Sequence, residues 1–256
     1  MNAWWNLTKE SFLILRRDRV FLPIIFIGIV VAVFANIASN WGVENYQKIL
    51  FDIGLAGFRL TGATVAMLWG VRMIADPLKD RSIELRIASP SARFSWLMSR
   101  FIGLSFCLVL MGFIFAGVWQ GLMMLNNFGQ MTNLQNWAIG LLVLEWIILG
   151  ALGLLLGTLA GFSTAIFATV ALWITGLVAP LVAATLGPNS DPAQLQMVEF
   201  VANVWNFQRF NLIDQLEVGS NHVILSDLLP RLEWAGCVLA GCLTLAALIF
   251  QKKDLT

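Results

Sequence analysis

Residues 137–186 read WAIGLLVLEWIILGALGLLLGTLAGFSTAIFATVALWITGLVAPLVAATL, and Glu145 is the one charged side chain among them. A helix needs about 20 mostly apolar residues, at about 1.5 Å each, to cross about 30 Å of hydrocarbon. This run is far too long for one crossing, and residues 157–161 give it a tight, uncharged turn. The stretch therefore predicts two consecutive membrane-spanning helices, Trp137–Gly157 and Phe162–Leu186.

The composition of the whole chain supports a membrane location. Of 256 residues, 59% are apolar and 12% are charged, and the mean hydropathy is +0.79. Soluble domains use about 25% charged residues, so this chain has too little polar surface to cover a water-soluble globule. The surplus apolar surface is expected to face lipid.

The same length rule predicts four further spans. They are Phe21–Ser39, Leu50–Ile74, Trp96–Leu125 and Trp234–Phe250. The first is longer than the about 7–15 residues of a signal-peptide core, and no clear A-x-A site follows it, so we treat it as a retained span. The predicted fold is an all-α integral membrane protein with six transmembrane helices, in a single domain over residues 1–256.

The distribution of lysine and arginine predicts the orientation, because cytoplasmic loops retain basic residues. With six spans, both termini and the connection between the second and third spans share one side. Arg59 lies inside a span, and Lys48, Arg209 and Arg231 fall on the opposite side. We therefore expect both termini in the cytoplasm and the chain in the cell (inner) membrane, because the first side holds Lys9, Arg16, Arg17, Arg19, Arg72, Lys79, Arg81, Arg86, Arg93, Arg100, Lys252 and Lys253.

Three segments are not expected to cross. Residues 3–19 alternate apolar side chains such as Phe12 with charged ones such as Lys9, which is typical of an interfacial helix on the cytoplasmic membrane surface. The other interpretation is a positive flank that only fixes topology. Residues 187–231 place Leu195, Val198 and Trp205 at helical spacing, which favours an amphipathic outer helix, a partial re-entry, a lid or simple packing.

Residues 76–93 form the third segment, a charged connection on the cytoplasmic side. Asp76–Pro77 and Ser89–Pro90 are both helix-start signals, because an aspartate or serine caps free amides and proline fits the first helical position. The prediction is a short helix between them, with the third span starting at Pro90. Such an elbow suits docking to a cytoplasmic partner, or is an ordinary loop that enforces topology; its candidate coupling residues are Asp76, Lys79, Arg81, Glu84, Arg86 and Pro90.

Ionisable residues within spans are candidates for a functional site, because charge is costly in hydrocarbon. Glu145 lies near the middle of the fourth span and Arg59 lies in the second, with Asp52 seven residues earlier on the same face. The three are candidates for a translocation path or for polar contacts within the bundle. For Glu145 we favour an interhelical hydrogen bond over a substrate contact.

Several chemistries have no matching motif. The sequence contains no G-x-x-x-x-G-K-[ST] loop and no G-x-S-x-G elbow, and its one histidine, His222, has no neighbouring cysteine or histidine. The net charge of +1 does not favour nucleic acid. We expect no enzyme activity, no metal and no cofactor in this chain.

The whole chain, in order, resembles the ABC type-2 exporter permeases, in particular the branch described as multicopper-enzyme-maturation permeases. The similarity lies in Leu7–Glu10 with Leu13–Asp18, Lys79–Pro90 with Arg93 and Arg100, Phe210–Asp214 with Gly219, and Phe250–Leu255. The resemblance implies a membrane subunit that pairs with a second copy or a related permease. It also implies two cytoplasmic ATPase subunits that bind ATP and Mg²⁺, with the elbow as the coupling helix. A non-transporting scaffold and an ion-coupled secondary transporter are the alternatives; the substrate stays open.

Overall fold

The computed structural model describes residues 8–14, 21–39, 46–79, 90–127, 131–186, 192–212 and 225–252. Every secondary-structure element in these ranges is helical. After a short N-terminal helix at residues 8–14, the elements are α2 (Phe21–Ser39), α3 (Tyr46–Lys79), α4 (Pro90–Leu125), α5 (Asn133–Leu159), α6 (Phe162–Thr185), α7 (Pro192–Val204), the 3₁₀ helix η1 (Phe207–Phe210) and α9 (Leu225–Lys252).

Five of these helices are long and apolar enough to cross a membrane. They are α3, α4, α5, α6 and α9, and α2 has a shorter apolar stretch, Pro23–Ala38. The predicted all-α membrane fold is therefore confirmed in its class. The helices extend beyond most predicted spans, because a helix continues past the hydrocarbon into polar flanks; α9 begins at Leu225 instead of Trp234.

Glycines bring α3 and α5 into backbone contact at the centre of the bundle. A Cβ added at Gly153 would lie 3.0 Å from the Met67 carbonyl oxygen, and one at Gly157 would lie 3.1 Å from that of Val71. Small residues permit such close approach between membrane helices. Gly153 and Gly157 are thus the residues at which the two backbones meet, whereas a Cβ added at Gly161 would have no neighbour within 4 Å.

Large aromatic side chains fill the spaces that other glycines leave. Phe58 of α3 and Phe115 of α4 stack at 4.5 Å between ring centroids, and both are almost fully buried. The ring of Trp146 lies over Gly62, where any side chain would collide with it. The stacked rings join α3 to α4, and the pairing of Gly62 with Trp146 joins α3 to α5.

The N-terminal helix at residues 8–14 packs on α4. Ser11 is buried and its Cβ lies 2.7 Å from the point where a Cβ on Gly103 would be; Phe12 meets Phe106 edge-on at 5.1 Å. The described part of the predicted interfacial segment is thus helical, and its remaining residues lie outside the described ranges.

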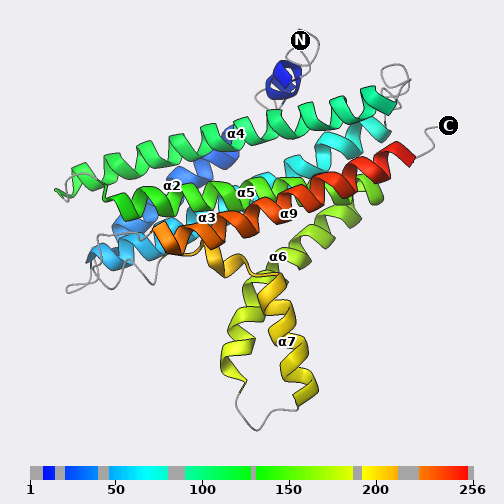
Figure 1. The fold of residues 1–256 in the computed structure, drawn as a ribbon. Coiled ribbons are helices and arrows are strands. Elements are labelled where there is room, and N and C mark those ends of the chain that lie inside the picture. Colours follow the sequence, from blue (N-terminus) through cyan, green and yellow to red (C-terminus); the bar gives the residue numbers. More distant parts are fainter. Residues whose placement is uncertain are drawn as a thin grey trace.

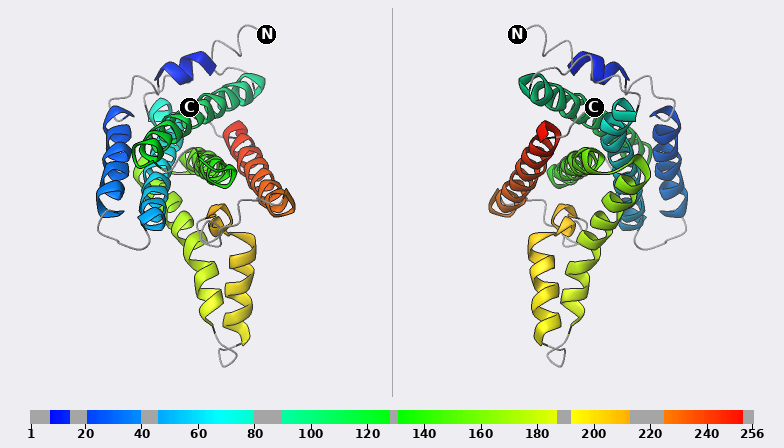
Figure 2. Two further views of the ribbon diagram at one scale, coloured as in Figure 1. Left: turned by 90° about the vertical axis from the view of Figure 1, so that its left-hand side faces the viewer. Right: turned by 90° about the vertical axis from the view of Figure 1, so that its right-hand side faces the viewer.

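The C-terminal part of α6 and α7 form a hairpin that leaves the side of the bundle (Figures 1 and 2). We call residues 176–185 of α6 together with α7 the arm. Within it, Leu195, Val198 and Val201 are half-buried, whereas Gln196 and Glu199 are exposed. Residues 192–204 of the segment predicted to lie outside the spans are helical, and their antiparallel pairing with α6 was not predicted.

The structure corrects the predicted start of the elbow. Asp76 and Pro77 do not begin a new helix, because α3 continues through both to Lys79. Proline removes one backbone donor, a small loss this close to the end of a helix. The second signal is confirmed, since α4 starts at Pro90.

We call the end of the bundle where α3 ends and α4 begins the elbow end. There the start of α4 contacts the end of α9. Arg93 Nη1 donates to the Gln251 carbonyl at 3.0 Å, and Trp96 stacks on Phe250 at 5.5 Å. The ends of α3, α4 and α9 gather here in Figure 1.

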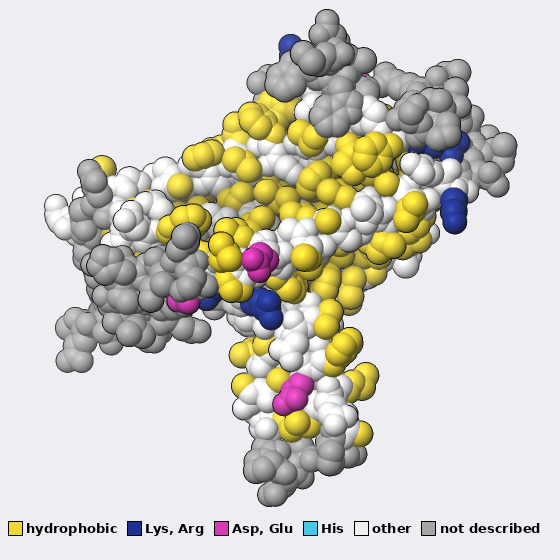
Figure 3. All heavy atoms as spheres, viewed as in Figure 1, with side chains coloured by type: hydrophobic (Ala, Val, Ile, Leu, Met, Phe, Trp, Pro, Cys, Tyr) yellow, Lys and Arg dark blue, Asp and Glu magenta, His cyan; other side chains and the backbone are white. Residues whose placement is uncertain are grey.

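The surface of the bundle and of the arm carries many exposed apolar side chains. Figure 3 shows hydrophobic side chains over the bundle and the arm, with few charges between them. Phe26, Phe113 and Phe167 are among the exposed aromatic residues, at 65%, 74% and 76%. Exposed apolar surface on this scale suits contact with lipid, as expected for a membrane-embedded protein.

Candidate functional site

Arg59 of α3 and Glu145 of α5 form a buried ion pair. Arg59 Nε lies 2.8 Å from Glu145 Oε2, and the side chains are 14% and 0% exposed. A buried charge is tolerated when it is paired and hydrogen-bonded. The pair therefore fixes two membrane-spanning helices to each other at a point where neither charge could remain alone.

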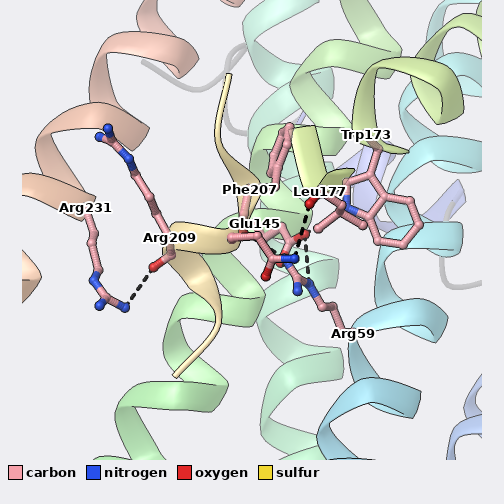
Figure 4. A network of polar contacts seen from close by, with 8 residues as sticks. Arg59, Glu145, Trp173, Leu177, Phe207, Arg209 and Arg231 are labelled. Atoms are coloured by element: carbon pink, nitrogen blue, oxygen red, sulfur yellow. Dashed lines mark hydrogen bonds and ion pairs between the residues drawn. The ribbon is translucent and has the colours of Figure 1, made fainter. Parts of the chain in front are cut away.

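The Arg59 guanidinium contacts two different parts of the chain. Its Nε donates to both carboxylate oxygens of Glu145, at 3.1 and 2.8 Å, and its Nη2 donates to the Phe207 carbonyl at 2.8 Å. Trp173 Nε1 on α6 donates to Glu145 Oε1 at 2.8 Å. One carboxylate and one guanidinium thus connect α3, α5, α6 and η1 (Figure 4).

A glycine on α6 makes room for η1 beside this pair. A Cβ on Gly176 would lie 2.9 Å from Trp205 Cδ1 and would collide with the Phe207 ring. Phe207 is fully buried, and its ring meets that of Trp205 edge-on at 5.4 Å. The absence of a side chain at Gly176 therefore places the Phe207 carbonyl within reach of Arg59.

Polar side chains also bind backbone carbonyls around η1. Trp205 Nε1 donates to Leu172 at 2.7 Å, and Gln208 Nε2 donates to Leu177 at 3.3 Å, so both bonds join the segment to α6. On the other side, two α9 residues bind the same region: Trp234 Nε1 donates to Val204 at 3.0 Å and Arg231 Nη1 to Arg209 at 2.8 Å.

The structure brings two of the predicted site residues together. Arg59 and Glu145 were each identified as intramembrane charges, and the favoured interhelical contact of Glu145 is present as an ion pair. The third predicted residue, Asp52, also lies on α3 and is half-exposed. The ion-pair partner of Arg59 is Glu145 on α5.

The predicted coupling residues lie elsewhere, at the elbow end. Asp76 and Lys79 are exposed in the last turn of α3, and Pro90 opens α4. Arg81, Glu84 and Arg86 lie outside the described residues.

Sequence reasoning missed the partners of the pair. Two isolated opposite charges in separate spans are a signal that they compensate each other, since neither is stable alone in hydrocarbon. That signal could have indicated the Arg59–Glu145 contact, but the sequence analysis did not pair these two residues. Trp173 and the Phe207 carbonyl carry no comparable signal. The sequence does not distinguish an indole or a backbone carbonyl that contacts the ion pair from one that does not.

The site has the chemistry of a structural or mechanical connection. Its one carboxylate is fully enclosed and already accepts bonds from Arg59 and Trp173. Within the described ranges, no three His, Cys, Asp or Glu side chains lie close enough to share a metal ion. What the arrangement can do is hold four segments in one relative position.

Comparison with known proteins gives no assignment. No family model matches the chain, and no curated protein matches it.

Proposed function

We propose that the chain is the membrane-spanning permease subunit of an ABC transporter, an exporter whose ATP and Mg²⁺ are bound by separate cytoplasmic ATPase subunits. The observation that carries the proposal is the link between α3 and α4. The long helix α3 ends at Lys79 and the long helix α4 begins at Pro90. The ten residues that connect them are rich in charge. A force applied to that link acts directly on two helices of the core.

The arrangement at the elbow end also supports the proposal. Arg93 and Trp96, in the first two turns of α4, contact the last turn of α9. A partner that binds residues 80–89 would therefore act on α3, α4 and α9 together. The sequence resemblance to type-2 exporter permeases implies that the same connection docks the ATPase. The apolar runs and the distribution of lysine and arginine predict six spans, of which α2 is the first, with both termini in the cytoplasm.

The enclosed ion pair disfavours the ion-coupled alternative. Secondary transporters keep their coupling-ion sites accessible near the middle of the membrane. Glu145 is 0% exposed and is bound to Arg59 and Trp173, so it is not available to a transported cation.

The proposal is tested by purifying the tagged chain from its native membrane in mild detergent and identifying the bound subunits by mass spectrometry. We expect a protein with a nucleotide-binding motif, and ATP hydrolysis only in its presence. Recovery of the intact chain without such a subunit, from membranes where both are expressed, would overturn the proposal.

Charge reversal tests the elbow itself. Arg81→Glu and Glu84→Lys are expected to lower recovery of the ATPase subunit at least about tenfold. The matched control is Glu199→Lys, which reverses an exposed charge on the arm and should leave recovery unchanged. Equal losses in all three variants would contradict docking at the elbow.

A further inference from the structure

The arm is held to the rest of the molecule at its base, near η1. Trp205 binds the Leu172 carbonyl in the bundle part of α6, and Gln208 binds the Leu177 carbonyl in the part of α6 that belongs to the arm. Arg59 instead reaches η1 from α3, through the Phe207 carbonyl. Arg59 therefore connects η1 to α3, whereas Trp234 and Arg231 connect the same region to α9.

The same arginine lies on the helix that leads to the elbow. Twenty residues separate Arg59 from Lys79, which is about 30 Å along one continuous helix. A helix transmits displacement along its axis as a stiff element. Movement of α3 at the elbow end would therefore move the guanidinium, and with it the carbonyl that the guanidinium holds.

We propose that Arg59 is a positioning residue that couples the arm to α3, so that α3 and the arm change position together. Glu145 is the counter-charge that keeps the guanidinium oriented, because it occupies Nε and leaves Nη2 directed at Phe207. The part of the proposal that concerns ATP-driven movement rests on the proposed function.

The substitution Arg59→Lys separates the two roles of the arginine. A lysine keeps the positive charge beside Glu145, so the buried carboxylate stays compensated. A single ammonium lacks the planar fork of guanidinium and does not reproduce two bonds in divergent directions. The variant should fold and lose the bond to η1.

Hydrogen exchange of the purified chain measures α7 of the arm and η1 at its base. In Arg59→Lys we expect exchange in residues 192–212 to rise about tenfold, with exchange in α5 and α9 unchanged. The matched control is Arg93→Lys, which makes the same change at another arginine that donates to a backbone carbonyl, at the elbow end. The control should leave residues 192–212 as in the wild type.

Two results would overturn the coupling role of Arg59. One is wild-type exchange of residues 192–212 in Arg59→Lys. The other is a rise of equal size throughout the chain, which would indicate general loss of stability.

A second measurement uses the complex with its ATPase subunit. Addition of ATP should change exchange at residues 192–212 in the wild type, and Arg59→Lys should remove that change while the ATPase subunit stays bound. An arm that does not respond to ATP in an intact wild-type complex would overturn the coupling. Absence of any ATPase subunit would instead overturn the proposed function, and the exchange of the purified chain would still decide whether Arg59 positions the arm.

Discussion

The α3–α5 interface and the arm differ in how much of each is closely packed. At the interface, glycines bring two backbones into contact, and buried aromatic rings fill the remaining space. The arm leaves the bundle with its apolar side chains largely exposed. Close packing is confined to its base, where Phe207 lies against Gly176 and side chains bond to backbone carbonyls. Close packing tolerates little displacement, whereas a few directional bonds can break and re-form. The comparison indicates that the interface is the rigid part of the molecule and the arm the part able to move.

The largest expected effect comes from adding bulk at the interface. Gly153→Leu would drive a side chain into the backbone of α3, which cannot yield locally as a side chain can. We expect loss of most folded protein, or a drop of more than about 3 kcal/mol in the free energy of unfolding, measured by thermal unfolding in detergent.

Gly140→Leu is the matched control for that substitution. Gly140 lies on the same helix, is exposed and has nothing within 4 Å of an added Cβ. Its unfolding midpoint should stay at the wild-type value, and a similar loss in both variants would contradict close packing as the cause.

The second effect comes from breaking the ion pair that joins the two regions. Glu145→Leu leaves the largely buried Arg59 without its carboxylate, which should cost about 3 kcal/mol in the free energy of unfolding. The double variant Arg59→Met/Glu145→Leu removes both charges and should recover most of that loss in the same thermal assay. Additive losses in the double variant would show that the two charges do not interact.

The third effect is local to the arm. Gly176→Ala places a methyl group against the side chains of Phe207 and Trp205. Side chains can shift to make room, unlike the α3 backbone that faces Gly153. The expected cost is about 1–2 kcal/mol. Hydrogen exchange should rise in residues 205–212 and stay unchanged in α5. Protection lost first in α5 would reverse the assignment of rigid and mobile parts.

Sequence reasoning predicted the elements of the bundle better than their association. Apolar length alone placed the helices, and α2 occupies the predicted residues Phe21–Ser39. It failed at Asp76–Pro77, because a proline near a helix end can be accommodated by the preceding turn as well as begin a new helix.

Of the candidate site, the charged residues were predictable and their surroundings were not. The cost of a lone charge in hydrocarbon identifies Arg59 and Glu145 from the sequence. The contribution of η1 depends on a backbone carbonyl, and the approach that makes it available depends on Gly176, one of many glycines in apolar helices. Tertiary packing decides which of them matters.

The smallest expected effect tests whether single bonds hold the base of the arm. Trp205→Phe keeps an aromatic ring beside Phe207 and removes the indole N–H that donates to the Leu172 carbonyl. Hydrogen bonds between membrane helices contribute about 0.6 kcal/mol on average, so exchange in residues 192–212 should rise about two- to threefold. Trp137→Phe, at a 42%-exposed indole on α5, is the matched control and should leave exchange unchanged.

The size of that rise discriminates between two ways of securing the arm. If each bond at the base contributes independently, Trp205→Phe and Arg59→Lys together should multiply their separate effects on exchange. If the bonds form one cooperative unit, either variant alone should release the arm and the pair should add nothing. Since Trp205 binds α6 and Arg59 binds η1 from α3, the contacts share no partner atom, and we expect the effects to multiply.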